Sequence, residues 1–168
     1  MSVLLQVTNR EIKTHNKAFS TERKKPRALY KGVIRKQGVK MIVVYGIKEK
    51  LNPIKARLSD VIHSCMQSVL GMPEDKRAHR FIPLVKEDFY YPGGRDDTYT
   101  VIEINMMAGR QVETQKTLIK TLFQEIERQL HILPLNIEIT IKEQAPHQWG
   151  FRGMTGDEAK DLKYKVNV

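Results

Sequence analysis

The sequence predicts an α+β protein with two α/β layers, in which duplicated β-α-β units form a four-stranded sheet with two helices on one face. A strand–helix–strand order occurs twice, and the first strands of the two units begin at about residues 41 and 99, some 58 residues apart. Each helix shows a single apolar stripe at spacings of three and four residues. Because a right-handed crossover makes the strands of a unit parallel, both helices are expected on the same face.

The first unit opens with MIVVYGI at 41–47, an apolar, β-branched run typical of a buried strand. Asn52 followed by Pro53 predicts the start of a helix, since Asn caps free N–H groups and Pro fits the first helical position. Gly71 is expected to end this helix. AHRFIPLVK at 78–86 predicts the second strand, and its proline indicates a sheet edge or a bend.

The second unit repeats this order after a turn at 91–97, which contains the sequence YPGGR. YTVIEINM at 99–106 predicts the third strand, and an apolar stripe predicts a helix over about 112–131. NIEITIKE at 136–143 alternates strictly and predicts the fourth strand. LKYKVNV at 162–168 is expected to form a short terminal strand.

One face of such a sheet is left without helices. Neighbouring subunits are the simplest way to cover it, so the sequence predicts an oligomer.

Almost all of the net positive charge of the chain lies in its first 40 residues. Residues 1–40 contain eleven Lys and Arg but only two Glu, whereas residues 41–168 carry 18 basic and 17 acidic residues. We therefore expect a folded domain at 41–168 and a basic N-terminal extension at 1–40. The extension is expected to be either disordered or not native. If it is not native, Met41 is the biological start. Nucleic-acid binding is expected only through the extension.

Several classes of protein are disfavoured by the composition. The single cysteine, Cys65, allows no intrachain disulfide, which favours the cytoplasm. There is no secretory signal and no apolar run long enough for a membrane span, so no membrane association is expected. The sequence has no HExxH or CxxC spacing, P-loop, GxGxxG or GxSxG, so neither a metal nor a cofactor is expected.

Five segments in this order resemble the tautomerase superfamily. They are KEKLNPIKARLSDVIHSCM at 48–66, GMPEDKRAHRF at 71–81, YPGGR at 91–95, AGRQVETQK at 108–116 and WGFRG at 149–153. The resemblance covers residues 41–168. It is strongest to uncharacterised bacterial tautomerase-like proteins and more distant to the malonate semialdehyde decarboxylase family. It implies a tautomerase-type fold, a homotrimer and active sites near the subunit boundaries.

The resemblance also implies proton transfer by an amino-terminal proline amine. Here Ile42 follows Met41, so the usual proline is lacking. The catalytic group is therefore left open: it is the Met41 amine only if the chain starts there. His79 is the other candidate for acid–base work, because its unperturbed pKa lies near 6.5.

Other positions match the family's pocket. Arg110 stands where the family binds the substrate carboxylate, and Trp149 and Phe151 match the aromatic pair that walls the pocket. Arg77, His79 and Arg80 form a local basic group, which would favour a small anionic substrate if it lines the site. Each position also has a structural interpretation: Arg110 as a helix-start residue, the aromatic pair as core or interface, and the basic group as a surface strand edge.

The sequence thus predicts a tautomerase-like isomerase, in which keto–enol proton transfer acts on small 2-oxo or enol carboxylates. The missing proline makes weak or altered activity part of this expectation. The alternative is a non-catalytic, trimeric tautomerase-fold binding protein.

Overall fold

The computed structural model describes residues 40–159. Its main elements are β1 (Lys40–Ile47), α2 (Lys48–Leu51), α3 (Lys55–Leu70), β2 (His79–Leu84), β3 (Thr100–Met107), α4 (Val112–Leu130) and β4 (Ile137–Gln144). The short strands β5 (Gly150–Phe151) and β6 (Met154–Thr155) follow, and three 3-10 turns lie at Lys86–Asp88, Pro134–Asn136 and Pro146–Gln148. Residues 1–39, and the terminal strand expected at 162–168, lie outside the described residues.

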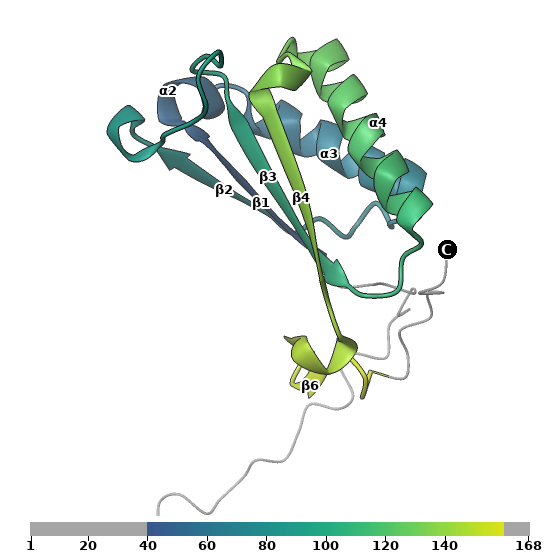
Figure 1. The fold of residues 1–168 in the computed structure, drawn as a ribbon. Helices are drawn as coiled ribbons and strands as arrows, with labels where there is room; N and C mark the ends of the chain where they lie inside the picture. Colours follow the sequence, from purple (N-terminus) through teal and green to yellow (C-terminus); the bar gives the residue numbers. More distant parts are fainter. Residues whose placement is uncertain (1–39, 160–168) are drawn as a thin grey trace, which may run out of the picture. The chain divides into compact units, whose positions relative to one another are not determined.

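The four long strands form one mixed sheet in the order β2-β1-β3-β4. β1 pairs with β2 in parallel and β3 pairs with β4 in parallel, whereas the central pair β1–β3 is antiparallel. Helices α3 and α4 both lie on one face of this sheet (Figure 1). The predicted duplicated β-α-β fold is therefore confirmed, and the proline-containing strand β2 is an edge strand.

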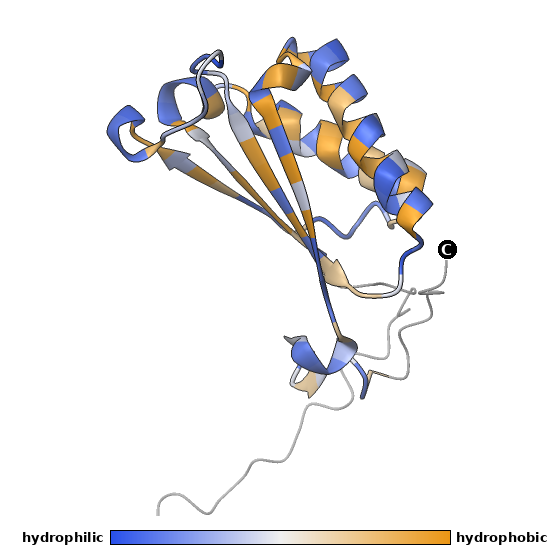
Figure 2. Ribbon diagram, in the orientation of Figure 1, coloured by the Kyte–Doolittle hydropathy of each residue, from blue (hydrophilic) through white to orange (hydrophobic). Residues whose placement is uncertain are grey.

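The core fills the space between the sheet and the two helices. Ile42 and Val44 of β1 face Ile102 and Ile104 of β3, and all four are at most 2% exposed. Successive side chains of a strand alternate between its two faces, so these residues share the helix-covered face. The apolar faces of α3 and α4 turn toward it (Figure 2). Burial of this layer is the main force that holds the helices on the sheet.

The start of the first long helix differs from the prediction. α2 ends at Leu51, and α3 begins only at Lys55, after a turn. Asn52 caps no N–H group of α3; instead, its side-chain oxygen accepts a hydrogen bond from Lys55 Nζ at 3.4 Å. The end was predicted correctly, because Gly71 closes α3 with a left-handed φ of 63°.

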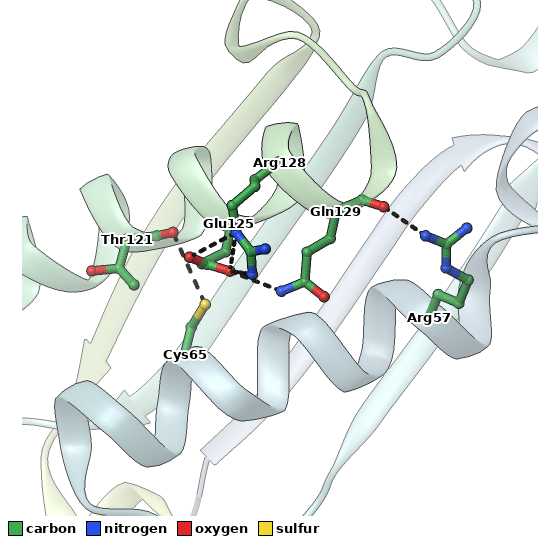
Figure 3. A network of polar contacts seen from close by, with 6 residues as sticks. All are labelled: Arg57, Cys65, Thr121, Glu125, Arg128 and Gln129. Atoms are coloured by element: carbon green, nitrogen blue, oxygen red, sulfur yellow. Dashed lines mark hydrogen bonds and ion pairs between the residues drawn. The ribbon is translucent and has the colours of Figure 1, made fainter.

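Polar contacts join α3 and α4 beside the core (Figure 3). Arg57 Nη2 donates to the carbonyl of Gln129 at 2.6 Å, and the Cys65 thiol points to the carbonyl of Thr121 at 4.0 Å. Burial, and to a lesser degree Glu125, raises the pKa of the Cys65 thiol to about 11. Cys65 is therefore a protonated packing residue near neutral pH rather than a nucleophile.

The opposite face of the sheet carries polar side chains. Glu103 accepts hydrogen bonds from Tyr45 at 3.4 Å and from Lys142 at 2.7 Å, across three neighbouring strands. No helix within residues 40–159 covers this face (Figure 1). None of the helices in this part of the chain combines the length and apolar character needed to cross a bilayer.

A buried amide fixes the turn before β3 to the start of β4. Asn136 is 2% exposed, and its Nδ2 donates to Asp96 Oδ2 at 2.8 Å and to Thr98 Oγ1 at 3.1 Å. Its side-chain oxygen accepts a hydrogen bond from the backbone N–H of Asp96 at 3.2 Å. The amide thus uses both its donor and its acceptor in this contact.

Candidate functional site

One end of the sheet collects most of the predicted site residues. Because β1 and β2 run opposite to β3 and β4, the starts of β1 and β2 lie at the same end as the ends of β3 and β4. Lys40 and His79 are the first residues of their strands, and Arg110 follows three residues after the end of β3.

Arg110 is a buried cation at this end, with 8% of its surface exposed. Gly109 before it has a φ of 119°, which favours glycine and turns the chain from β3 toward α4. One carboxylate oxygen of Glu143 accepts the backbone N–H groups of Gly109 and Arg110, at 3.2 and 3.3 Å. Gln115 donates to the Arg110 carbonyl at 3.3 Å. The backbone that carries the guanidinium is therefore fixed from β4 and from α4.

Lys40 is a second buried cation, with 7% exposed. It lies opposite Met106 in the β1–β3 register, and it shares the helix-covered face with Ile42 two residues on. Burial, assisted by the nearby Arg110 charge, lowers the pKa of its ammonium group to about 7. Lys40 falls within the basic extension predicted at 1–40, so it was not predicted as a site residue. Because it stands two residues before the buried Ile42, the alternation of strand side chains could have indicated its burial.

His79 and Arg77 both contact Ser59 of α3. His79 Nδ1 shares a hydrogen bond with the Ser59 hydroxyl at 2.9 Å, and Arg77 Nη1 donates to the same oxygen at 3.4 Å. Arg77 also forms an ion pair with Asp60 at 2.5 Å. Burial, then the neighbouring His63 and Arg77, lowers the pKa of His79 to about 4.

This environment changes what the pair can do. The His79 ring is neutral above pH 4 and is a weak base near neutrality. Asp60 offsets part of the charge of Arg77. The preference of this local basic group for an anionic substrate stays a prediction. His63 is 2% exposed and its Nε2 lies 3.0 Å from the carbonyl of Glu74, as expected for a structural histidine.

Trp149 and Phe151 lie beyond the end of β4, at the start of a small hairpin. The hairpin turn consists of Arg152 and Gly153, which have φ values of 54° and 76°. Positive φ at both central residues matches the right-handed twist of the paired strands. The Arg152 guanidinium lies 5.2 Å from the centre of the Phe151 ring. The indole N–H of Trp149 is buried without a hydrogen-bond partner among residues 40–159.

Gly156 holds this hairpin against the sheet. Its N–H lies 2.9 Å from the carbonyl of Trp149 and 3.1 Å from that of Pro146. A Cβ atom at this position would collide with the Met107 methyl group and lie 2.6 Å from the Pro146 carbonyl oxygen. The hairpin and its aromatic residues are thus connected to the end of β3 by a contact that needs glycine.

Met41 lies within β1, opposite Asn105, and its nitrogen is the peptide amide that follows Lys40. A chain that starts at Met41 would carry a free amine at this residue, and a catalytic role for that amine stays a prediction. Between residues 40 and 159, no three His, Cys, Asp or Glu side chains are grouped so that they could hold a metal ion.

A pocket of about 180 Å³ lies at the other end of the sheet. It is lined by Gly46 and Ile47 at the end of β1, by Tyr99 and Thr100 at the start of β3, and by α4 residues such as Leu130. Because β1 and β3 are antiparallel, this pocket is separated from Lys40 and Arg110 by the length of the strands. No pattern in the sequence predicted this pocket.

The fold and this sheet end define a class of protein: a duplicated β-α-β domain with a buried arginine after its third strand. Residues 76–152 match the family described as tautomerase enzyme. Native fused 4-OT has a similar structure, with a TM-score of 0.64 and 19% identity over 71% of this chain and 98% of that chain. Malonate semialdehyde decarboxylase has a TM-score of 0.62 and 18% identity, over 68% and 92% of the two chains.

A member of the cis-3-chloroacrylic acid dehalogenase family shares the same fold, with a TM-score of 0.61 and 14% identity over 68% of this chain and 82% of that chain. The family match over residues 76–152 and the shared fold support the predicted membership of the tautomerase superfamily. The predicted tautomerase-type fold is confirmed.

Proposed function

We propose that the protein is a tautomerase-like isomerase that moves a proton within small 2-oxo or enol carboxylates, in the cytoplasm and without the usual amino-terminal proline. The observation that carries this proposal is the buried guanidinium of Arg110 at the sheet end where β1 begins and β3 ends. The similar structures include a tautomerase-type protein, a decarboxylase and a dehalogenase, which supports chemistry of this general kind.

Arg110 suits a carboxylate for physical reasons. Its planar fork can donate two parallel hydrogen bonds to one carboxylate, and the guanidinium group carries a delocalised positive charge. Burial reduces competition from water, so the same pairing is stronger here than at the surface. Ketonisation then needs a group that takes the enol hydroxyl proton and a donor that protonates the neighbouring carbon. Trp149 and Phe151 are proposed to exclude water from this step.

Replacing Arg110 by methionine is expected to raise KM for phenylpyruvate and for 2-hydroxymuconate by about 10- to 100-fold, because a hydrogen-bonded ion pair contributes about 1.5–3 kcal/mol. The KM of Arg110→Lys is expected to lie between those of the wild type and Arg110→Met, because an ammonium group keeps the charge but lacks the planar fork of the guanidinium. Ketonisation is followed by ultraviolet absorbance with the full chain.

The matched control is Arg128→Met, which removes an exposed arginine from the last turn of the helix that Arg110 precedes. It is expected to leave KM unchanged within about twofold, because exposed ion pairs contribute little. The isomerase proposal is wrong if the wild-type chain converts neither substrate.

A homotrimer is also proposed. The sheet face that no helix of residues 40–159 covers and the trimeric fused 4-OT structures support it. Sedimentation equilibrium of the full chain is expected to give three times the 19.5 kDa monomer mass. A monomer at micromolar concentration would refute this part of the proposal.

The alternative function is a non-catalytic binding protein, and two observations favour it. The Met41 nitrogen is an amide within β1, and burial leaves His79 a weak base. This alternative predicts carboxylate binding that depends on Arg110 but no turnover. Calorimetric titration with the same two compounds separates it from the isomerase.

A further inference from the structure

Two buried cations, Lys40 and Arg110, lie at the same sheet end. Both are less than 9% exposed, and no carboxylate between residues 40 and 159 forms an ion pair with Lys40. A buried ammonium group is costly unless it is paired or becomes neutral. The proximity of a second positive charge raises that cost further. The fold therefore holds Lys40 in a place that favours its neutral amine.

We infer that the Lys40 side chain is a reactive amine that forms an imine with the carbonyl of a 2-oxo carboxylate bound by Arg110. This inference rests on the proposed function for its class of ligand. In a 2-oxo acid the carbonyl carbon is bonded directly to the carboxylate carbon, so a carboxylate on Arg110 brings the carbonyl to the same sheet end. Lys40 lies at the start of β1 and Arg110 in the turn after β3, so the proposed ligand would be held from both elements.

Imine formation needs only the amine, the carbonyl group and proton transfers. The neutral Nζ lone pair attacks the carbonyl carbon, and a proton moves from the nitrogen to the former carbonyl oxygen to give a carbinolamine. Loss of that oxygen as water forms the C=N bond, and protonation of the nitrogen gives an iminium ion. The iminium ion acidifies the adjacent carbon, so a proton can leave and return there, which is the proton movement that an isomerase needs.

The pKa of about 7 supports this role. An exposed lysine has a pKa near 10.4 and is almost entirely protonated at pH 7, so it holds roughly a thousandfold less neutral amine than Lys40. The lower basicity of Lys40 reduces its intrinsic nucleophilicity, which offsets part of this advantage. A selective but smaller gain in reactivity is therefore expected.

The test uses the full chain with pyruvate and sodium cyanoborohydride at pH 7, followed by peptide mapping of the reduced adduct. Lys40 is expected to be labelled at least about tenfold faster than any other lysine. Lys40→Arg, which keeps the charge, is expected to abolish that fast phase, and the exposed Lys120→Arg on α4 is expected to leave it unchanged. Labelling spread evenly over exposed lysines would overturn the inference, and this result does not depend on any variant folding.

A second arm tests the part played by Arg110. Propanal carries a carbonyl but no carboxylate, so it can react with the amine without using the guanidinium. Arg110→Met is expected to slow labelling by pyruvate about tenfold more than labelling by propanal. Equal slowing of the two would overturn the joint site.

The ketonisation assay separates this inference from the proposed function. Lys40 labelling without ketonisation by the wild-type chain supports the imine and refutes the isomerase. Full ketonisation by Lys40→Arg, together with labelling spread evenly over exposed lysines, refutes the imine and leaves the isomerase standing.

Discussion

Replacing Asn136 by aspartate is expected to lower the free energy of unfolding by about 3–5 kcal/mol at pH 7.5, because the change leaves a charge buried without compensation. The position is 2% exposed, and the new carboxylate would face Asp96 in place of the Nδ2 donor that now lies 2.8 Å from it. The donor to Thr98 is lost at the same time.

The loss is expected to shrink as the pH falls. Burial and the neighbouring carboxylate raise the pKa of the introduced group above its unfolded value near 3.9. A group whose pKa is higher in the folded state destabilises the fold as the pH rises through that folded pKa, and the penalty is absent below the unfolded value. Urea unfolding at pH 7.5 and pH 5, each compared with the wild type, measures the difference.

Asn136→Ala is the matched control, because it removes the same hydrogen bonds without adding a charge. We expect a loss of about 1–3 kcal/mol that is similar at both pH values. Equal behaviour of the alanine and aspartate variants at both pH values would show that Asn136 is not buried in the protein in solution.

Replacing Gly156 by alanine is expected to cost about 1–3 kcal/mol, as overpacking of a close contact does. The new methyl group would meet the Pro146 carbonyl oxygen, which is backbone and cannot turn away as a side chain can. The hairpin would have to move from the end of β3. Trp149 is the single tryptophan of the chain, so its fluorescence reports this movement directly. A shift of its emission to longer wavelength is expected as water reaches the indole.

Gly150→Ala is the control within the same hairpin, since a Cβ there meets nothing within 4 Å. Its stability is expected to stay within about 0.5 kcal/mol of the wild type, and its emission is expected to be unchanged. If the two variants lose the same stability, the close approach at Gly156 does not exist in solution.

Most of the fold could be predicted because its determinants are local. Alternating or β-branched apolar runs located the four strands, and Gly71 located the end of α3 through its left-handed backbone. The predicted start of α3 was wrong because Leu51 belongs to the separate short helix α2 and is buried in the core, where it is 2% exposed. That preference depends on tertiary packing, and the Asn-Pro pair alone does not reveal it.

The candidate site could be predicted only in part. Arg110 was singled out by the family resemblance, at the position after Gly109 that follows the third predicted strand. Lys40 was missed, since a lysine in a basic segment is normally exposed, and its burial depends on residues that are distant in sequence. His79 was given its unperturbed pKa, whereas burial, and then the nearby His63 and Arg77, lower that pKa and make it a much weaker base.

The antiparallel central pair has a consequence for how the two ends of the sheet are related. Exchanging the two β-α-β units turns the sheet end for end, so the domain has an approximate internal two-fold axis between β1 and β3. Under that symmetry the start of β1, with Lys40, corresponds to the start of β3, where the 180 Å³ pocket lies. The two sheet ends that this symmetry relates therefore differ: one holds two buried cations, and the other is lined as an open pocket.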